Sequence, residues 1–183
     1  IVAPGRYIRL WEEAYQTQWA SMPMLDAGNG IFVAEMPPEA RIHRHLVRYR
    51  IVATDRAGQQ VAVPYADDPQ PNFSYFVYDA LPIWHGAVNP SADDGQSQRM
   101  AFDFGAMRSL PVYHLIAQRS DVEDAQFIPN AGRVEGYMGT DYLWWGTLVY
   151  DGRVYDHIGF RARGGLHRYA VGKNMWKFNF NRG

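Results

Sequence analysis

The chain has 183 residues, of which 47% are hydrophobic and 15% aromatic, and its formal net charge is −1. This length and apolar content allow one large domain or two small ones with a packed core, and they exclude wholesale disorder. The balanced charge gives no overall attraction to nucleic acid or anionic membrane, so any phosphate recognition must be local. Because cysteine is absent, disulfides, thiol catalysis and thiolate zinc sites are excluded. No apolar run approaches the roughly 18 residues of a membrane span.

The first 84 residues read as short strands separated by turns, which is typical of an antiparallel β-sandwich. Residues 21–30 are a loop by composition, with Pro23, Asp26 and two glycines. The strands are expected at 6–10, 31–36, 46–54, 60–63 and 72–78.

The segment 46–54 carries the clearest period-two pattern of this first part. The alternation predicts that Val47, Tyr49 and Ile51 pack into the sandwich core. It places Arg48 and Arg50 on the solvent face, because a register slip of one residue would bury both arginines.

The segment 85–99 is the best candidate for a linker, since it is rich in glycine, serine and aspartate and has no aromatic residue after His85. A buried strand is expected at 110–117. Ser120 and Glu123 match a capping box, so a short helix should run to about Phe127. A loop is expected at 130–139.

The last part of the chain predicts a sheet made of residues 143–150, 154–163 and 174–180. Asp151-Gly152 joins the first two strands and supplies the positive φ angles of a two-residue hairpin turn. Val149 should therefore lie in the same sheet as Val154 and Ile158.

Cationic residues gather on this terminal sheet. Arg161 and Arg163 are two apart and so share a face of their strand, and Gly164-Gly165 would let backbone amides approach an anion. Lys177 lies between Trp176 and Phe178 and points away from both. Two interpretations stay open: a phosphate-binding face, or a solvated strand face that ends in a turn.

The remaining motifs give weaker evidence of a function. His43 and His45 would share a strand face, but no third ligand accompanies them and neighbouring arginines disfavour a metal. We therefore predict no metal site in this chain. No serine lies in a nucleophile elbow, and no carboxylate pair stands out.

Three stretches together resemble the kinase-like family of spore-coat protein H (CotH). They are a Leu-Pro-Val strand from Leu110, the Arg161-Ala-Arg-Gly-Gly165 turn, and the Lys173-Asn-Met-Trp-Lys-Phe-Asn-Phe180 strand. The segments 47–55, 64–68 and 72–79 resemble the fibronectin-type β-sandwich found upstream in larger exported relatives. The resemblance implies a sandwich at 1–84, a linker at 85–99, and the N-terminal part of an α+β kinase-like lobe at 100–183.

The family implies an atypical protein kinase that uses ATP and magnesium to phosphorylate serine-rich surface or coat proteins, with an exported or coat-associated location. Residue by residue, Lys177, Arg163, Gly164 and Gly165 match its nucleotide-phosphate site, with Arg161 beside them. Gly165 departs from the family, which more often has Asn there. The acidic residues that bind the metal and act as catalytic base have no counterpart in this chain, so we predict no catalytic residue here and expect an inactive piece of a longer protein.

Two alternatives remain. The chain is either a non-catalytic extracellular module that presents its sheets to a polysaccharide or protein, or a structural spacer. Nucleic acid is not expected as a partner, no membrane span is expected, and the sequence leaves the oligomeric state open.

Overall fold

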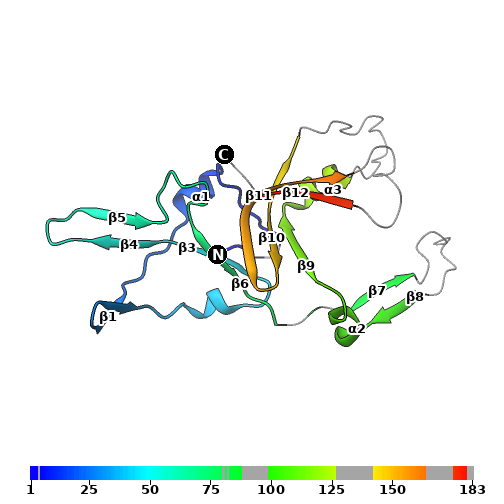
Figure 1. Ribbon diagram of the computed structural model, residues 1–183, viewed down its shortest axis with the longest axis horizontal. Helices are drawn as coiled ribbons and strands as arrows, with labels where there is room; N and C mark the ends of the chain where they lie inside the picture. Colours follow the sequence, from blue (N-terminus) through cyan, green and yellow to red (C-terminus); the bar gives the residue numbers. More distant parts are fainter. Residues whose placement is uncertain are drawn as a thin grey trace. The chain divides into compact units, whose positions relative to one another are not determined.

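The computed structural model describes residues 1–3, 5–79, 81, 83–87, 99–126, 142–163 and 175–180 (Figure 1). By its internal contacts the chain divides into two compact units, Ile1–Tyr78 (unit 1) and Asp79–Gly183 (unit 2). The described residues are mainly β, and the strands pair antiparallel throughout. This agrees with the mainly β fold class expected from the sequence.

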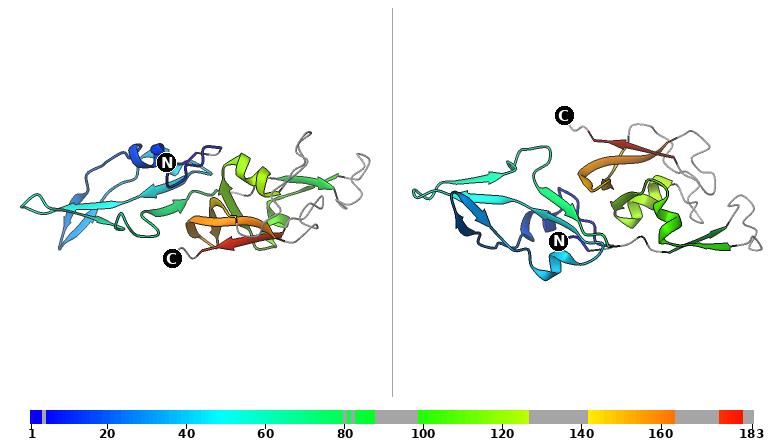
Figure 2. Two further views of the ribbon diagram at one scale, coloured as in Figure 1. Left: turned by 90° about the horizontal axis from the view of Figure 1, so that it is seen from above. Right: turned by 60° about the horizontal axis from the view of Figure 1, so that its bottom comes forward.

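Unit 1 is built from strand pairs. Within the described residues β1 pairs with β2, β3 with β6, and β4 with β5, each as a two-stranded sheet. Figure 2 shows the β4–β5 pair as a narrow ribbon from two sides. Its elements are α1 (Glu13–Thr17), β1 (Leu25–Gly28), β2 (Ile31–Val33), the 3-10 helix η1 (Pro38–Arg41), β3 (Leu46–Tyr49), β4 (Ile51–Thr54), β5 (Gln60–Val63) and β6 (Phe73–Phe76).

The β1–β2 hairpin corrects the expected loop at 21–30. Leu25 pairs with Val33, and the turn between the strands contains Asn29 and Gly30 at φ 55° and 77°. Positive φ at both central residues is the requirement of a tight two-residue hairpin turn, which Asn-Gly meets well. The composition of this segment marked a loop, but the Asn-Gly pair is itself a hairpin signal.

The prediction for 46–54 is partly wrong. The strand breaks at Arg50, so that β3 and β4 belong to different sheets. Val47 is buried as expected, but Arg48 is only 8% exposed and Ile51 is 40% exposed. Arg48 tolerates burial because its Nη1 donates to Ile8 O at 2.7 Å and its guanidinium stacks on aromatic rings.

Unit 2 contains a four-stranded sheet in the order β12-β11-β10-β9 among the described residues. A separate pair, β7 with β8, takes up part of the segment 85–99 expected as a linker. The elements are β7 (Trp84–Ala87), β8 (Arg99–Phe102), α2 (Phe104–Arg108), β9 (Tyr113–Ala117), α3 (Arg119–Gln126), β10 (Trp144–Tyr150), β11 (Arg153–Arg163) and β12 (Met175–Asn179).

The β10–β11 hairpin confirms the sequence prediction. Val149 pairs with Val154, and the turn holds Asp151 and Gly152 at φ 49° and 72°. Ile158 lies further along the same sheet, opposite Gly146. The strand expected at 110–117 starts only at Tyr113, and Leu110 is 71% exposed rather than buried. Pro111 has no N–H to donate to a ladder, which accounts for the later start.

The core of unit 2 lies between the sheet and α3. Phe160 is fully buried, and it clusters with Trp144 and with Ala125 of α3. Partly buried apolar side chains complete this cluster: Leu115, Ala117, Val122, Trp176 and Phe178. We call this side of the sheet the helix face and the other side the opposite face. The expected loop at 130–139 lies outside the described residues, as does Phe127, the expected end of α3.

Candidate functional site

Three cationic side chains share the opposite face of the sheet in unit 2. Arg161 of β11 pairs directly with Lys177 of β12, and Arg163 pairs with Met175. Directly opposed residues of an antiparallel pair point to the same side, and so do residues two apart. Trp176 and Phe178 point to the helix face and pack into the core. The alternation predicted from the sequence therefore places Lys177 on the same side as Arg163.

These cations differ in exposure. Lys177 and Arg163 are exposed, whereas Arg161 is half-buried. The Nη1 of Arg161 reaches Ala162 O at 3.5 Å, and its Nε is buried without a hydrogen-bond partner among the residues that the structure describes. Buried N–H groups are normally satisfied, so an unpartnered one needs an explanation. This Nε is the buried side-chain nitrogen of the described residues whose hydrogen-bonding capacity is left unused.

The glycines of the predicted site, Gly164 and Gly165, lie outside the described residues, and so does Lys173. The structure thus brings together Arg161, Arg163 and Lys177 of the predicted set. Cation spacing on neighbouring strands favours an anion with several oxygens, since each guanidinium can donate two parallel hydrogen bonds to phosphate.

A buried polar cluster on the same opposite face was not predicted. The β10–β11 register shifts between Gly146 and Leu148, so Asp156 and His157 together oppose Thr147. Thr147 Oγ1 donates to Asp156 Oδ1 at 2.5 Å, and His157 N donates to the same oxygen at 2.9 Å. His157 Nε2 lies 3.4 Å from Asp156 Oδ2. A bulge of this kind places two side chains on one side of the sheet.

The three side chains of this cluster are buried, at 0–2% exposure. The sequence offered one weak signal, a run of two polar residues inside an otherwise alternating strand. Acid, imidazole and hydroxyl groups in contact can serve proton transfer, but the contacts seen here fix the bulge. We therefore assign this cluster a structural role.

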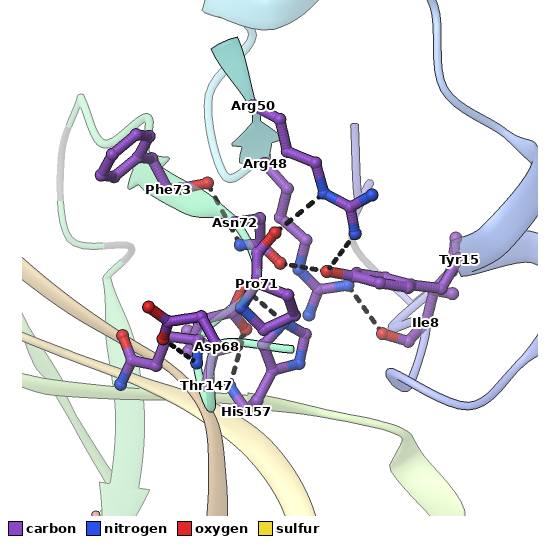
Figure 3. Close-up of polar contacts among 12 residues, drawn as sticks. Ile8, Tyr15, Arg48, Arg50, Asp68, Pro71, Asn72, Phe73, Thr147 and His157 are labelled. Carbon is purple, nitrogen blue, oxygen red and sulfur yellow. Dashed lines mark hydrogen bonds and ion pairs between the residues drawn. The ribbon is translucent and has the colours of Figure 1, made fainter. Parts of the chain in front are cut away.

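Unit 1 has its own cluster of cations and rings (Figure 3). Tyr15 OH donates to Asn72 Oδ1 at 2.5 Å and accepts from Arg50 Nη2 at 3.1 Å. The Arg50 guanidinium lies 4.2 Å from the centre of the Trp19 ring, and its Nε donates to Pro71 O at 2.8 Å. The Arg50 guanidinium is thus held by a carbonyl oxygen, a hydroxyl and a ring face. These contacts attach the N-terminal segment with Tyr15 and Trp19 to the residue that follows β3, which is a structural role.

The two histidines of the pair contact different neighbours in unit 1. His43 stacks on Tyr78 with ring centres 5.9 Å apart, and the Nδ1 of His45 lies 3.1 Å from Glu39 O. Over the described ranges of the chain, no three side chains of His, Asp or Glu converge as metal ligands. In the same part of the chain, none of the helices has the length and hydropathy to cross a membrane.

Comparison of the chain with protein-family models, with curated proteins and with solved structures found no match.

Proposed function

We propose that unit 2 is the N-terminal part of a CotH-like atypical protein kinase, and that the opposite face of its sheet holds the phosphates of ATP. The observation that carries this proposal is the cross-strand pair of Arg161 with Lys177, with Arg163 on the same face. Their aromatic neighbours on β12, Trp176 and Phe178, occupy the other side of the sheet and pack into the core there. Phosphoryl transfer depends chiefly on holding and neutralising phosphate oxygens.

The side chains have separate tasks in this proposal. Lys177 supplies a point charge to a phosphate oxygen, and the planar guanidinium groups of Arg161 and Arg163 fix its orientation. The magnesium ion that the resemblance implies finds no ligand set of three side chains among the described residues. We expect the isolated chain to be inactive as a kinase.

The same proposal includes the domain that precedes the kinase-like lobe, the protein substrate and the location. In this proposal unit 1, whose described strands pair as three antiparallel two-stranded sheets, is the fibronectin-type β-sandwich that precedes the kinase-like lobe. The protein substrate is a serine-rich surface or coat protein, and the location is exported, at the cell surface or in a coat.

Lys177→Ala tests the assignment in a complete protein that contains this chain. We expect loss of nucleotide-dependent phosphorylation, measured as transfer of labelled phosphate to a serine-rich acceptor. Lys177 is exposed, so its truncation should change the free energy of unfolding by no more than about 0.5 kcal/mol.

The matched control is Arg153→Ala, which removes an exposed cation from the hairpin end of the same sheet. This variant should keep its phosphorylation rate. Full activity in Lys177→Ala would remove the assignment.

A non-catalytic binding module is the second candidate, and one observation favours it. The β1–β2 and β4–β5 pairs expose large apolar side chains, among them Leu25 at 70% and Val52 at 56%. Apolar patches on a surface mark interaction sites. If the chain is a binding module, Lys177→Ala should have no effect on binding. Apolar-to-polar changes on these two strand pairs should abolish it.

A further inference from the structure

We infer that Tyr113 of β9 and Tyr150 of β10 form an oxidative modification site. Hydrogen peroxide and a haem peroxidase join the two phenol rings there by a carbon–carbon bond, which gives a dityrosine cross-link within one chain. Among the described residues β9 is an edge strand of the four-stranded sheet, and the cross-link fastens it to β10. The cross-link does not depend on the kinase function proposed above.

The pairing of β9 with β10 brings the two tyrosines together (Figure 1). Tyr113 and Tyr150 are directly opposed in this antiparallel pair, so both side chains leave the same side of the sheet. The Cβ atoms of such partners lie about 4.5–5.5 Å apart. The two rings are stacked, with their centres 4.4 Å apart and their planes 12° from parallel. The reacting rings are therefore in contact before any oxidation takes place.

Both tyrosines are accessible to an oxidant in solution. Tyr113 is 57% exposed and Tyr150 is 37% exposed. Neither belongs to the core cluster around Phe160, so the rings can tilt toward each other without disturbing that core. Tyr113 also raises the pKa of Tyr150 above its ordinary value, chiefly because two phenolate charges would lie side by side. The stacking thus places the two hydroxyl groups, and the ring carbons next to them, close together.

A second pair of tyrosines, in unit 1, is arranged less favourably for coupling. The ring centres of Tyr49 and Tyr75 lie 6.3 Å apart and their planes are 53° from parallel. Both side chains are half-buried, and the Tyr75 hydroxyl donates to Ala40 O at 3.0 Å. Oxidation should therefore select the pair on β9 and β10.

The reaction removes one hydrogen atom from each phenol. The peroxidase passes the two electrons and two protons to hydrogen peroxide, whose O–O bond breaks to give two water molecules. Each tyrosyl radical has unpaired electron density on the ring carbons next to its oxygen, and two such carbons form the new bond. The proton on each of these carbons then returns to the oxygen, so both hydroxyl groups are restored. Two groups held in contact on one molecule react far faster than the same groups on separate molecules in dilute solution.

The test is oxidation of the 183-residue chain in dilute solution by a haem peroxidase with limiting hydrogen peroxide. Mass spectrometry of the intact chain should show a monomer lighter by two hydrogen atoms, and the product should have the blue fluorescence of dityrosine. After digestion with trypsin, the peptides 109–119 and 134–153 should be joined. Fragmentation of the joined peptides should place the bond between Tyr113 and Tyr150.

Two substitutions distinguish this pair from other exposed tyrosines. Tyr150→Phe keeps the ring but removes the phenol that loses the hydrogen atom, so the yield of joined peptides should fall at least about tenfold. Tyr142→Phe is the matched control, because Tyr142 is 51% exposed and lies on the same tryptic peptide as Tyr150. Its ring packs edge-on against Trp144, and its loss should leave the yield unchanged.

The cross-link should also change the unfolding of the chain. A bond between residues 113 and 150 restricts the unfolded chain between them, so the oxidised chain should unfold at a higher urea concentration than the untreated chain. Oxidised Tyr150→Phe should show no such rise. An unchanged urea midpoint in the fully cross-linked chain would overturn the role of the bond in fastening β9.

Four results would overturn the modification site itself. They are an undiminished yield of joined peptides in Tyr150→Phe, a bond that maps to other tyrosines, a monomer that gains oxygen instead of losing hydrogen, and cross-linked dimers whose share rises with protein concentration. The last result would show that the coupling occurs between chains and not within the stacked pair.

Discussion

The carboxylate of Asp156 shows how a single buried group depends on its hydrogen bonds. Thr147 Oγ1 and His157 N both donate to its Oδ1, and all three residues are buried. A buried carboxylate has lost its hydration, so each donor compensates part of a large desolvation cost. Removing one donor leaves that cost uncompensated.

We predict that Thr147→Val lowers the free energy of unfolding by about 1–3 kcal/mol, because the substitution keeps the shape and removes the hydroxyl donor. Urea unfolding followed by tryptophan fluorescence measures the change. The control is Thr54→Val on exposed β4, where the hydroxyl accepts only a long 3.3 Å bond from Gln60. Equal losses in both variants would contradict a special role for the Thr147 hydroxyl.

Tyr75 gives a prediction for alkaline pH. Its hydroxyl donates to Ala40 O at 3.0 Å. Burial raises the pKa of Tyr75 above its ordinary value, although the nearby Arg41 opposes this shift. The folded state therefore holds this proton more tightly than the unfolded state. The stability that results is fully present below about pH 10 and is lost as pH rises through the raised pKa.

Tyr75→Phe should accordingly cost about 1 kcal/mol at pH 8, where the hydrogen bond is intact. The difference from the parent chain should narrow above pH 10, since the phenylalanine variant has no proton to lose. Urea unfolding at several pH values measures both effects. Tyr65→Phe removes an exposed hydroxyl and should match the parent chain at every pH. A pH-independent difference for Tyr75→Phe would contradict the argument.

At the scale of elements, the β10–β11 hairpin depends on its turn. Asp151 and Gly152 both have positive φ, a conformation that costs a residue with a Cβ about 1–2 kcal/mol. Gly152→Ala should therefore destabilise unit 2 by roughly 1 kcal/mol, measured by thermal unfolding. Open space surrounds Gly152, so the cost comes from the backbone and not from a clash.

Asp151→Asn is the matched substitution for this turn. Asparagine adopts positive φ readily, so the free energy of unfolding should stay within about 0.5 kcal/mol of the parent chain. If Gly152→Ala were equally harmless, the turn would not be what fixes the register of the hairpin.

The contrast between β11 and β3 explains what the sequence could predict. The hairpin at 151–152 follows from local turn chemistry, and the side of the sheet that Lys177 takes follows from alternation. The prediction that Arg48 faces solvent was wrong because its partners, Ile8 O and the Tyr7 ring, lie about forty residues away in the sequence. A local pattern does not contain such partners.

The candidate site also has a part that the sequence could predict and a part that it could not. The shared face of Arg161 and Lys177 needed only their positions in two strands, whereas their direct pairing depends on register, which the structure supplies. The bulge at Asp156 and His157 adds one residue to β11 without changing the faces beyond it. Strict alternation of side chains along a strand gives no sign of such an insertion, so the buried cluster could not be predicted from the sequence.

At the scale of the whole molecule, the exposed apolar strands β4 and β5 are expected to favour association between chains. Every residue of β4 is exposed, including Ile51 and Val52, and Val61 and Val63 are exposed on β5. No residue of either strand is charged. Charged side chains on exposed strands are the usual protection against pairing with other chains. A β-branched ribbon without them favours association as the concentration rises.

Val52→Lys should therefore reduce concentration-dependent association of the chain, measured by light scattering over a dilution series. Because Val52 is 56% exposed, the free energy of unfolding should change by no more than about 0.5 kcal/mol. Ser21→Lys adds the same charge at an exposed position outside the strands and separates the effect of net charge from that of the ribbon. If both variants suppress association equally, net charge is the cause; if only Val52→Lys does so, the uncharged ribbon is the surface through which the chains associate.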